Sequence, residues 1–133
     1  MRTGLFAVLH AANSLEARVE ARLADVGLSL PKLAALHQLS QAGDSLPLGQ
    51  LAERLACVKS NVTQLVDRLE ADGLVRRVED PEDRRAVRAA VTALGKERYA
   101  AGVRQVERVQ AEFAETLSGI DQGALERVLS AIR

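Results

Sequence analysis

The fold is decided by the stretch SNVTQLVDRLEADGLVRRVEDPEDRRAVRAAVT, residues Ser60–Thr92. Apolar residues recur three or four apart in its first half, which predicts an amphipathic helix over about residues 59–72. A glycine ends this helix, and residues 74–79 and 86–91 predict two short strands around the tip DPEDRR. The stretch therefore predicts a helix that is joined directly to a small charged hairpin.

Most of the remaining chain has the apolar spacing of helices. The predicted helices cover residues 3–26, 31–43, 48–56, 93–117 and 124–133, and residues 44–47 are predicted to be a loop. The first helix and the long helix after the hairpin each carry an apolar stripe that the small middle part cannot cover. We therefore expect a mainly α fold in which the terminal helices pack together and against a second copy of the chain.

Composition excludes several classes of protein. The 133 residues are 47% hydrophobic and 27% charged, which is typical of a soluble globular domain. No apolar run approaches the roughly 20 residues of a membrane span, and the N-terminal residues predict a helix rather than a signal peptide. The single cysteine cannot form an intrachain disulfide, so we expect a reducing cytoplasm.

The charge balance bears on a nucleic-acid partner. The formal net charge is zero, from 18 basic and 18 acidic side chains. This balance argues weakly against DNA binding, because duplex DNA attracts positive proteins. The placement of the charges can matter more than their sum.

Residues 48–56 and 59–72 have the lengths and spacing of a helix-turn-helix, in which the second helix lies in the major groove of DNA. The outward positions of that helix include hydrogen-bonding groups and cations that suit bases and phosphates. The candidate DNA-binding residues on it are Lys59, Ser60, Asn61, Thr63, Gln64 and Arg68. The alternative is an ordinary polar helix face, because the same packing also occurs in proteins that do not bind DNA.

The hairpin favours the DNA interpretation, because a hairpin directly after the second helix has the position of a wing. Arg84 and Arg85 at its tip are suited to a narrow minor groove, where the negative potential is concentrated. We expect Asp83 to hold one of these guanidinium groups in a bidentate pair. The alternative is that the tip is an ordinary solvated charged turn. For the arginines on the strands, Arg76, Arg77 and Arg88, the sequence allows either contact with DNA phosphates or exposure to solvent.

The chain resembles the MarR family of winged helix-turn-helix regulators, most strongly over Leu48–Glu97. The resemblance is carried by the motifs DRLEADGLVRR, DPEDRR and VTALG, which follow a short leucine-rich helix in this order. Each motif alone is common, whereas their combination is specific. The resemblance implies a winged helix-turn-helix DNA-binding domain at residues 30–92, between dimerisation helices at residues 1–29 and 93–133.

The resemblance also implies the partners. A homodimer would bind a pseudo-palindromic operator in double-stranded DNA, with half-sites about 34–36 Å apart. Many members are repressors that are released by a small ligand, often a phenolic or other lipophilic anion, bound between the dimerisation helices and the winged module. By position, the candidate pocket residues here are Phe6, Leu9, His10, Asn13, Leu33, Leu36 and His37.

Two special kinds of regulation can be compared with the sequence. Some members sense oxidants through a cysteine in the first helix, but Cys57 lies instead at the turn before the second helix of the helix-turn-helix. It is a possible redox residue beside Lys59, or simply a small buried turn residue. Zinc needs three or four converging ligands, and the only histidines, His10 and His37, lie on separate helices. We therefore predict no metal site and no cofactor.

The sequence does not favour an enzyme, because it contains no Gly-rich phosphate loop, no Ser/His/Asp arrangement and no Cys/His cluster. The prediction is a sequence-specific transcriptional regulator, acting as a homodimeric repressor with a small-molecule effector. The alternative is a winged-helix module for protein–protein interaction. That alternative requires an apolar recognition face, whereas the face formed by Ser60, Asn61, Thr63, Gln64 and Arg68 is polar.

Overall fold

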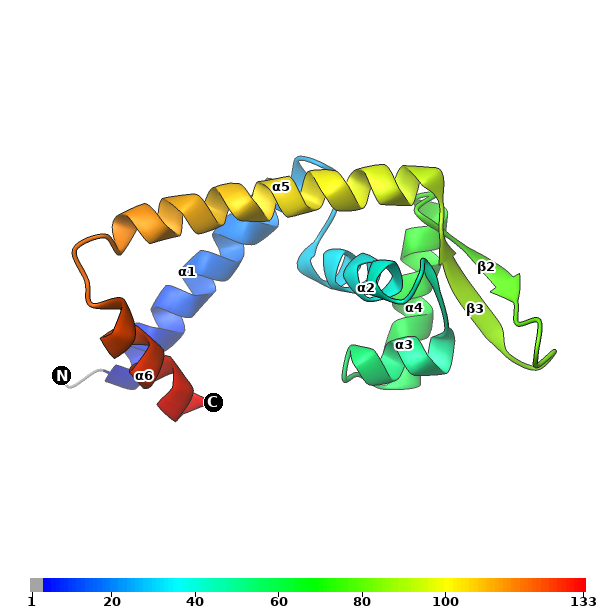
Figure 1. Cartoon of the computed structure of the whole chain (residues 1–133), viewed down its shortest axis with the longest axis horizontal. Helices are drawn as coiled ribbons and strands as arrows, with labels where there is room; N and C mark the ends of the chain where they lie inside the picture. Colours follow the sequence, from blue (N-terminus) through cyan, green and yellow to red (C-terminus); the bar gives the residue numbers. More distant parts are fainter. Residues whose placement is uncertain (1–3) are drawn as a thin grey trace.

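The computed structural model describes residues 4–133, in which six helices and three short strands are arranged as an arch (Figure 1). The elements are α1 (Gly4–Ala24), α2 (Leu30–Gln41), β1 (Ser45–Pro47), α3 (Leu48–Arg54), α4 (Lys59–Ala71), β2 (Val75–Glu79), β3 (Val87–Val91), α5 (Ala93–Thr116) and α6 (Gln122–Ile132). Helix α5 forms the top of the arch, α1 and α6 descend at one end, and the elements from α2 to β3 form the other end. The mainly α class with a small hairpin is confirmed.

Local signals set the helix ends. Ser29 caps α2 by accepting a hydrogen bond from the backbone N–H of Lys32, and a proline occupies its first turn. Thr92 joins two elements, because its side chain accepts from the N–H of Gly95 and donates to the carbonyl of Gly73. Gly73 itself has a φ of +77°, which lets the chain leave α4 and turn into β2.

The sheet corrects one prediction. Residues 44–47 were expected to be a loop, but Ser45–Pro47 form β1, which pairs antiparallel with β3 in the order β1-β3-β2. Leu46 lies opposite Ala89, and both side chains are buried. A three-residue edge strand that ends in proline is too short to show alternation in the sequence, so only its pairing with a strand over 40 residues away defines it.

The winged end of the arch contains the main hydrophobic core. Its fully buried large side chains include Leu36, Leu39, Leu51, Val62, Val66, Leu69, Leu74 and Val75. Helix α5 lies close against this core at Gly95, where a Cβ atom would lie 2.1 Å from the carbonyl oxygen of Leu74. The absence of a side chain at residue 95 therefore lets the long helix start directly against the end of α4.

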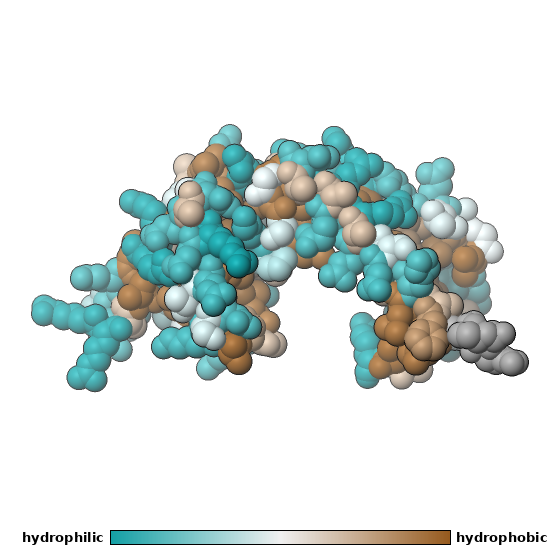
Figure 2. Space-filling view, turned by 180° about the vertical axis from the view of Figure 1, so that it is seen from behind, coloured by the Kyte–Doolittle hydropathy of each residue, from teal (hydrophilic) through white to brown (hydrophobic). Residues whose placement is uncertain are grey.

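The terminal helices are only partly covered. The C-terminal half of α1 packs against α5, and Leu23 and Val109 are buried there. The other end of α1 exposes four large apolar side chains: Leu5, Phe6, Val8 and Leu9. The C-terminal segment exposes four more, Ile120 before α6 and Val128, Leu129 and Ile132 within it. Figure 2 shows apolar side chains gathered at this end of the arch. The predicted packing of the first helix on the long helix is confirmed, and a large apolar surface remains uncovered.

Among residues 4–133, no helix is both long enough and apolar enough to cross a membrane.

Candidate nucleic-acid interface

The turn between α3 and α4 fixes the orientation of the second helix. Ala56 has a φ of +52°, and the N–H of Cys57 donates to the carbonyl of Ala52, which closes the end of α3 tightly. Val62, Val66 and Leu69 are buried against the core, so the opposite side of α4 faces outward. The predicted helix-turn-helix is therefore formed by α3 and α4.

All of the candidate DNA-binding residues on α4 are exposed: Lys59, Ser60, Asn61, Thr63, Gln64 and Arg68. They do not share one flat face, however. Asn61, Gln64 and Arg68 lie on the side of α4 that faces α2, whereas Lys59 lies on the side that faces the wing. Thr63 already uses its hydroxyl hydrogen on the carbonyl of Lys59, at 3.0 Å.

The wing tip is held by aspartate side chains that bond to the backbone. Asp83 Oδ1 accepts from the N–H of Arg85 at 3.0 Å, and Asp80 Oδ1 accepts from the N–H of Glu82 at 2.9 Å. In residues 4–133, Asp83 makes no ion pair with Arg84 or Arg85, so the expected bidentate pair is not formed. A short aspartate side chain reaches its own backbone two residues on more easily than a neighbouring guanidinium.

The wing and α4 meet at a small pocket of about 170 Å³. Lys59 from the first turn of α4 and Arg85 from the wing tip both line it, together with Gly49 at the start of α3. Residues from three separate elements thus place two cations around one hollow. Cations that converge in this way are suited to an anion such as a phosphate group.

Arg77 connects the hairpin to α4. Its guanidinium lies 2.8 Å from Glu70 and 2.5 Å from Asp67, and it also donates to the carbonyl of Thr63. Its backbone N–H donates to Glu70 as well, and these backbone and side-chain hydrogen bonds lower the pKa of the Glu70 carboxyl group. Arg77, which the sequence left open between phosphate and solvent, is therefore a structural brace.

Arg88 has a similar role inside the sheet. It donates to the hydroxyl of Ser45 at 3.1 Å and pairs with Asp80 at 3.4 Å. It therefore ties β3 to the edge strand β1 and to the base of the wing tip. Arg76, by contrast, is exposed on β2.

The candidate effector residues are divided by the structure. Leu33 and His37 line a groove of about 270 Å³ between α2 and α5, with Tyr99, Val103 and Val106 on the α5 side. Phe6, Leu9, His10 and Asn13 are exposed on the distant half of α1 and do not line this groove within one chain. Leu36 is fully buried in the core instead.

The α5 wall of this groove was missed as part of a candidate pocket. The apolar spacing of Tyr99, Val103 and Val106 was visible in the sequence, but it equally fits a helix face that only packs against other helices. The contact that reveals the wall is between the His37 Nδ1 and the Tyr99 hydroxyl, which lie 2.7 Å apart although 62 residues separate them.

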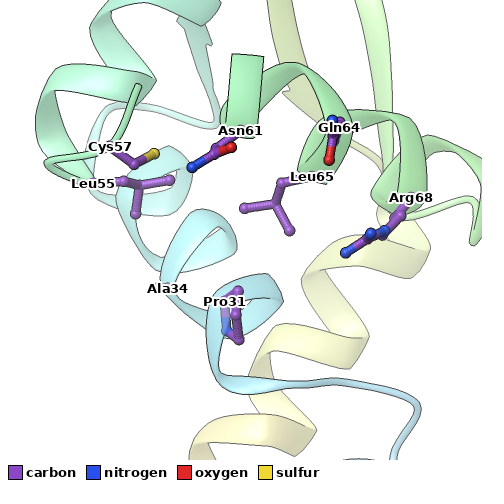
Figure 3. A pocket seen from close by; sticks show the side chains of 8 residues that line it. All are labelled: Pro31, Ala34, Leu55, Cys57, Asn61, Gln64, Leu65 and Arg68. Atoms are coloured by element: carbon purple, nitrogen blue, oxygen red, sulfur yellow. The ribbon is translucent and has the colours of Figure 1, made fainter. Parts of the chain in front are cut away.

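A second and larger pocket, of about 430 Å³, lies between α2 and α4 (Figure 3). Cys57 and Leu55 stand at one end of it, Arg68 at the other, and Leu65 projects between them. Cys57 is half-buried, and Lys59 is not among the residues that line this pocket. A redox role for Cys57 stays a prediction.

No group of three or more His, Cys, Asp or Glu side chains within residues 4–133 is placed to hold a metal ion.

Comparisons with known proteins agree with this architecture. The family model described as "MarR family" matches residues 28–87. The uncharacterised HTH-type transcriptional regulator YsmB of Bacillus subtilis is 40% identical over 58 residues, which cover 44% of this chain and 39% of the relative. The chain thus spans less than half the length of that relative.

Two solved structures have the same fold. A mutant of MarR from Escherichia coli complexed with operator DNA has a TM-score of 0.80 at 20% identity, covering 97% of this chain and 93% of the other. An organohalide-sensing regulator, RdhR, bound to 2,4-dichlorophenol also has a TM-score of 0.80, at 23% identity, covering 96% of this chain and 76% of the other.

The fold, with its helix-turn-helix and wing, is a winged helix-turn-helix fold. Residues 28–87 of the chain match the MarR family model, and the relatives that the chain resembles are HTH-type transcriptional regulators.

Proposed function

We propose that the chain is a sequence-specific, homodimeric repressor that binds duplex DNA and is released by a small ligand. The observation that carries the proposal is the pocket that Lys59 of α4 and Arg85 of the wing tip both line. A DNA phosphate bound there would fix the wing and α4 on the duplex together. A formal net charge of zero does not by itself oppose this, because Lys59 and Arg85 line the same pocket, which no acidic residue among residues 4–133 lines.

Helix α4 would then enter the major groove. Ser60 and Gln64 are one turn apart and exposed, and an amide side chain such as that of Gln64 can bond an adenine edge with two hydrogen bonds. Asn61 and Arg68 would lie toward the α2 side of the groove, and Thr63 toward the wing. Arg84 would reach the neighbouring minor groove, where arginine is favoured.

The homodimer would be formed through residues 1–29 and 93–133, on either side of a DNA-binding domain at residues 30–92. The support is the exposed apolar surface of α1 and α6, which includes Phe6, Leu9, Leu129 and Ile132. Burying one large apolar side chain contributes about 1.5–3 kcal/mol, so a few such residues favour association. Two winged modules would then face half-sites about 34–36 Å apart.

The effector would bind in the groove between α2 and α5, which connects the dimerisation helices to the winged module. A structural neighbour binds 2,4-dichlorophenol, which supports a small lipophilic effector. The ligand would act by favouring a spacing of the two winged modules that does not fit DNA. Its effect on DNA affinity can be no larger than its own preference for that spacing over the DNA-binding one. The proposed regulator would act in the cytoplasm.

The proposal is tested by selecting from a randomised duplex DNA library with the purified protein. We expect an enriched pseudo-palindromic sequence that binds in a gel-shift assay, with an affinity that falls steeply as salt increases. Enrichment of no sequence would contradict the proposal and favour the alternative of a protein-interaction module. The polar, cation-bearing surface of α4 and the wing does not favour that alternative.

A further inference from the structure

The groove between α2 and α5 has an unusual charge character. Its described lining consists of Leu30, Leu33, Ala34, His37, Tyr99, Val103, Val106 and Glu107. The set is mostly apolar, contains one carboxylate, and includes neither lysine nor arginine. A ligand in this groove would therefore meet apolar side chains and a negative charge.

The nearest cation on α2 is not free to offset this charge. Lys32 precedes Leu33 on α2, but its Nζ lies 2.7 Å from the Asp72 carboxylate at the end of α4. Glu107 has no ion-pair partner among residues 4–133, and its side chain is exposed beside the groove. Among the described residues that line the groove, an anionic ligand would meet the Glu107 carboxylate and no cation.

The polar wall of the groove also suits a positive charge. Tyr99 and His37 lie together there, with ring centroids 6.0 Å apart at an interplanar angle of 39°, and their OH and Nδ1 atoms are 2.7 Å apart. This contact holds the Tyr99 ring in place from a neighbouring helix. A cation within about 6 Å of such a ring is attracted by its electron-rich face.

We infer that the groove binds a lipophilic organic cation, whose apolar body contacts the leucine and valine side chains and whose charge lies beside the Glu107 carboxylate. This inference rests on the proposed ligand-controlled regulator, and it differs from the lipophilic anion that the family resemblance implies. Hydrophobic contact would provide most of the affinity, and Glu107 would provide the preference for positive charge.

The test uses three probes of similar shape and different charge: para-tert-butylbenzylamine, para-tert-butylbenzyl alcohol and para-tert-butylbenzoate. Their dissociation constants for the full chain are measured by isothermal titration calorimetry at neutral pH. We expect the amine to bind at least about fivefold more tightly than the alcohol, and the benzoate to bind most weakly. Equal binding of amine and benzoate, or binding of none of the three, would overturn the inference.

A pair of variants locates the preference. Glu107→Gln should remove the advantage of the amine over the alcohol and leave the affinity for the alcohol unchanged. Glu97→Gln changes an exposed carboxylate on α5 outside the groove and should preserve the order of the three probes. A preference for the amine that survives Glu107→Gln would also overturn the inference.

The same samples separate this inference from the proposed function. Sedimentation and DNA binding are measured before the probes are added. A dimer that binds DNA but does not prefer the amine would overturn only the cation site. A monomer that selects no DNA would overturn the proposed repressor, whatever the probes show.

Discussion

At the scale of single residues, the arginines of the hairpin have different roles although they lie close together in sequence. Arg77 and Arg88 have side chains 27% and 26% exposed and pair with acids of the chain itself. Arg84 and Arg85 make no side-chain ion pair within the described residues and project from the wing. The first pair therefore stabilises the wing, and the second pair remains exposed for the proposed contact with DNA.

The shared pocket predicts coupling between Lys59 and Arg85. Each single change, Lys59→Ala or Arg85→Ala, should weaken DNA binding about tenfold and reduce the salt dependence by the equivalent of about one phosphate contact. Because both cations would contact the same phosphate, the double variant should lose less than the sum of the two free energies. Fluorescence anisotropy at several salt concentrations measures the DNA affinity of the wild type, the two single variants and the double variant.

Arg104→Ala is the matched control, because Arg104 is exposed on α5 away from the wing. It should leave the affinity and the salt dependence unchanged. Additive losses for Lys59→Ala and Arg85→Ala would show that the two side chains do not share a contact.

Glu70 predicts a pH dependence of stability. Hydrogen bonds from the backbone and side chain of Arg77 lower its pKa in the folded protein below the ordinary value of 4.5. A lowered carboxyl pKa stabilises the fold above the pKa of the unfolded chain, and this contribution is lost as the pH falls through the folded value. Below about pH 4.5, Glu70→Gln should therefore lose less stability than the wild type as the pH falls.

Thermal unfolding followed by circular dichroism between about pH 6 and pH 3 checks this prediction. Glu53→Gln, which changes an exposed glutamate of α3, should keep the acid dependence of the wild type. Identical pH profiles for Glu70→Gln and the wild type would contradict the assignment.

At the scale of elements, the start of α5 sets the position of the long helix relative to α4. Gly95→Ala would place a Cβ atom 2.1 Å from a backbone oxygen, which cannot rotate away. We expect this change to destabilise the protein by about 1–3 kcal/mol, although alanine otherwise favours helices. Urea denaturation measures the change in the free energy of unfolding.

Two other glycines are useful for comparison. A Cβ atom at Gly102 would meet the side-chain ends of Leu23, Leu28 and Leu33 and no backbone atom among its nearest neighbours, so Gly102→Ala should cost less than Gly95→Ala. Gly49 in α3 has no atom within 4 Å of such a Cβ, so Gly49→Ala should be neutral or stabilising by up to about 1 kcal/mol. If Gly95→Ala is not the most destabilising of the three variants, the proposed close contact between Gly95 and the Leu74 carbonyl would be contradicted.

At the scale of the whole molecule, the arch leaves its apolar end uncovered (Figure 2). Leu129→Glu or Phe6→Glu would put a charge on that surface and should convert the proposed dimer into a monomer, because a buried unpaired charge costs several kcal/mol. Half-site affinity alone would remain, so binding to the complete operator should fall by at least about a hundredfold. Analytical ultracentrifugation and a gel-shift assay measure the two effects.

Leu94→Glu is the control, because Leu94 is similarly exposed but lies at the other end of the arch, at the start of α5. It should remain dimeric. A wild-type protein that is monomeric at micromolar concentration would contradict the dimer directly.

The sequence by itself determined the features that depend on neighbouring residues. The helices were predictable from apolar spacing, the starts of α2 and α5 from Ser29 and Thr92, and the hairpin from its two short strands. These signals are local, because caps, turns and helix periodicity involve residues within one or two turns of each other. The surface of α4 could also be predicted, since Val62, Val66 and Leu69 define its buried side.

Only the tertiary structure decided the features that join distant residues. It paired β1 with β3 and made Arg77 a brace between the hairpin and α4. It also brought Lys59 and Arg85 to one pocket, and it separated Phe6 and His10 from the groove that contains His37. None of these contacts leaves a pattern in sequence spacing, because each depends on how complete elements pack. The sequence thus specified which elements form, and their packing around one core specified which side chains meet.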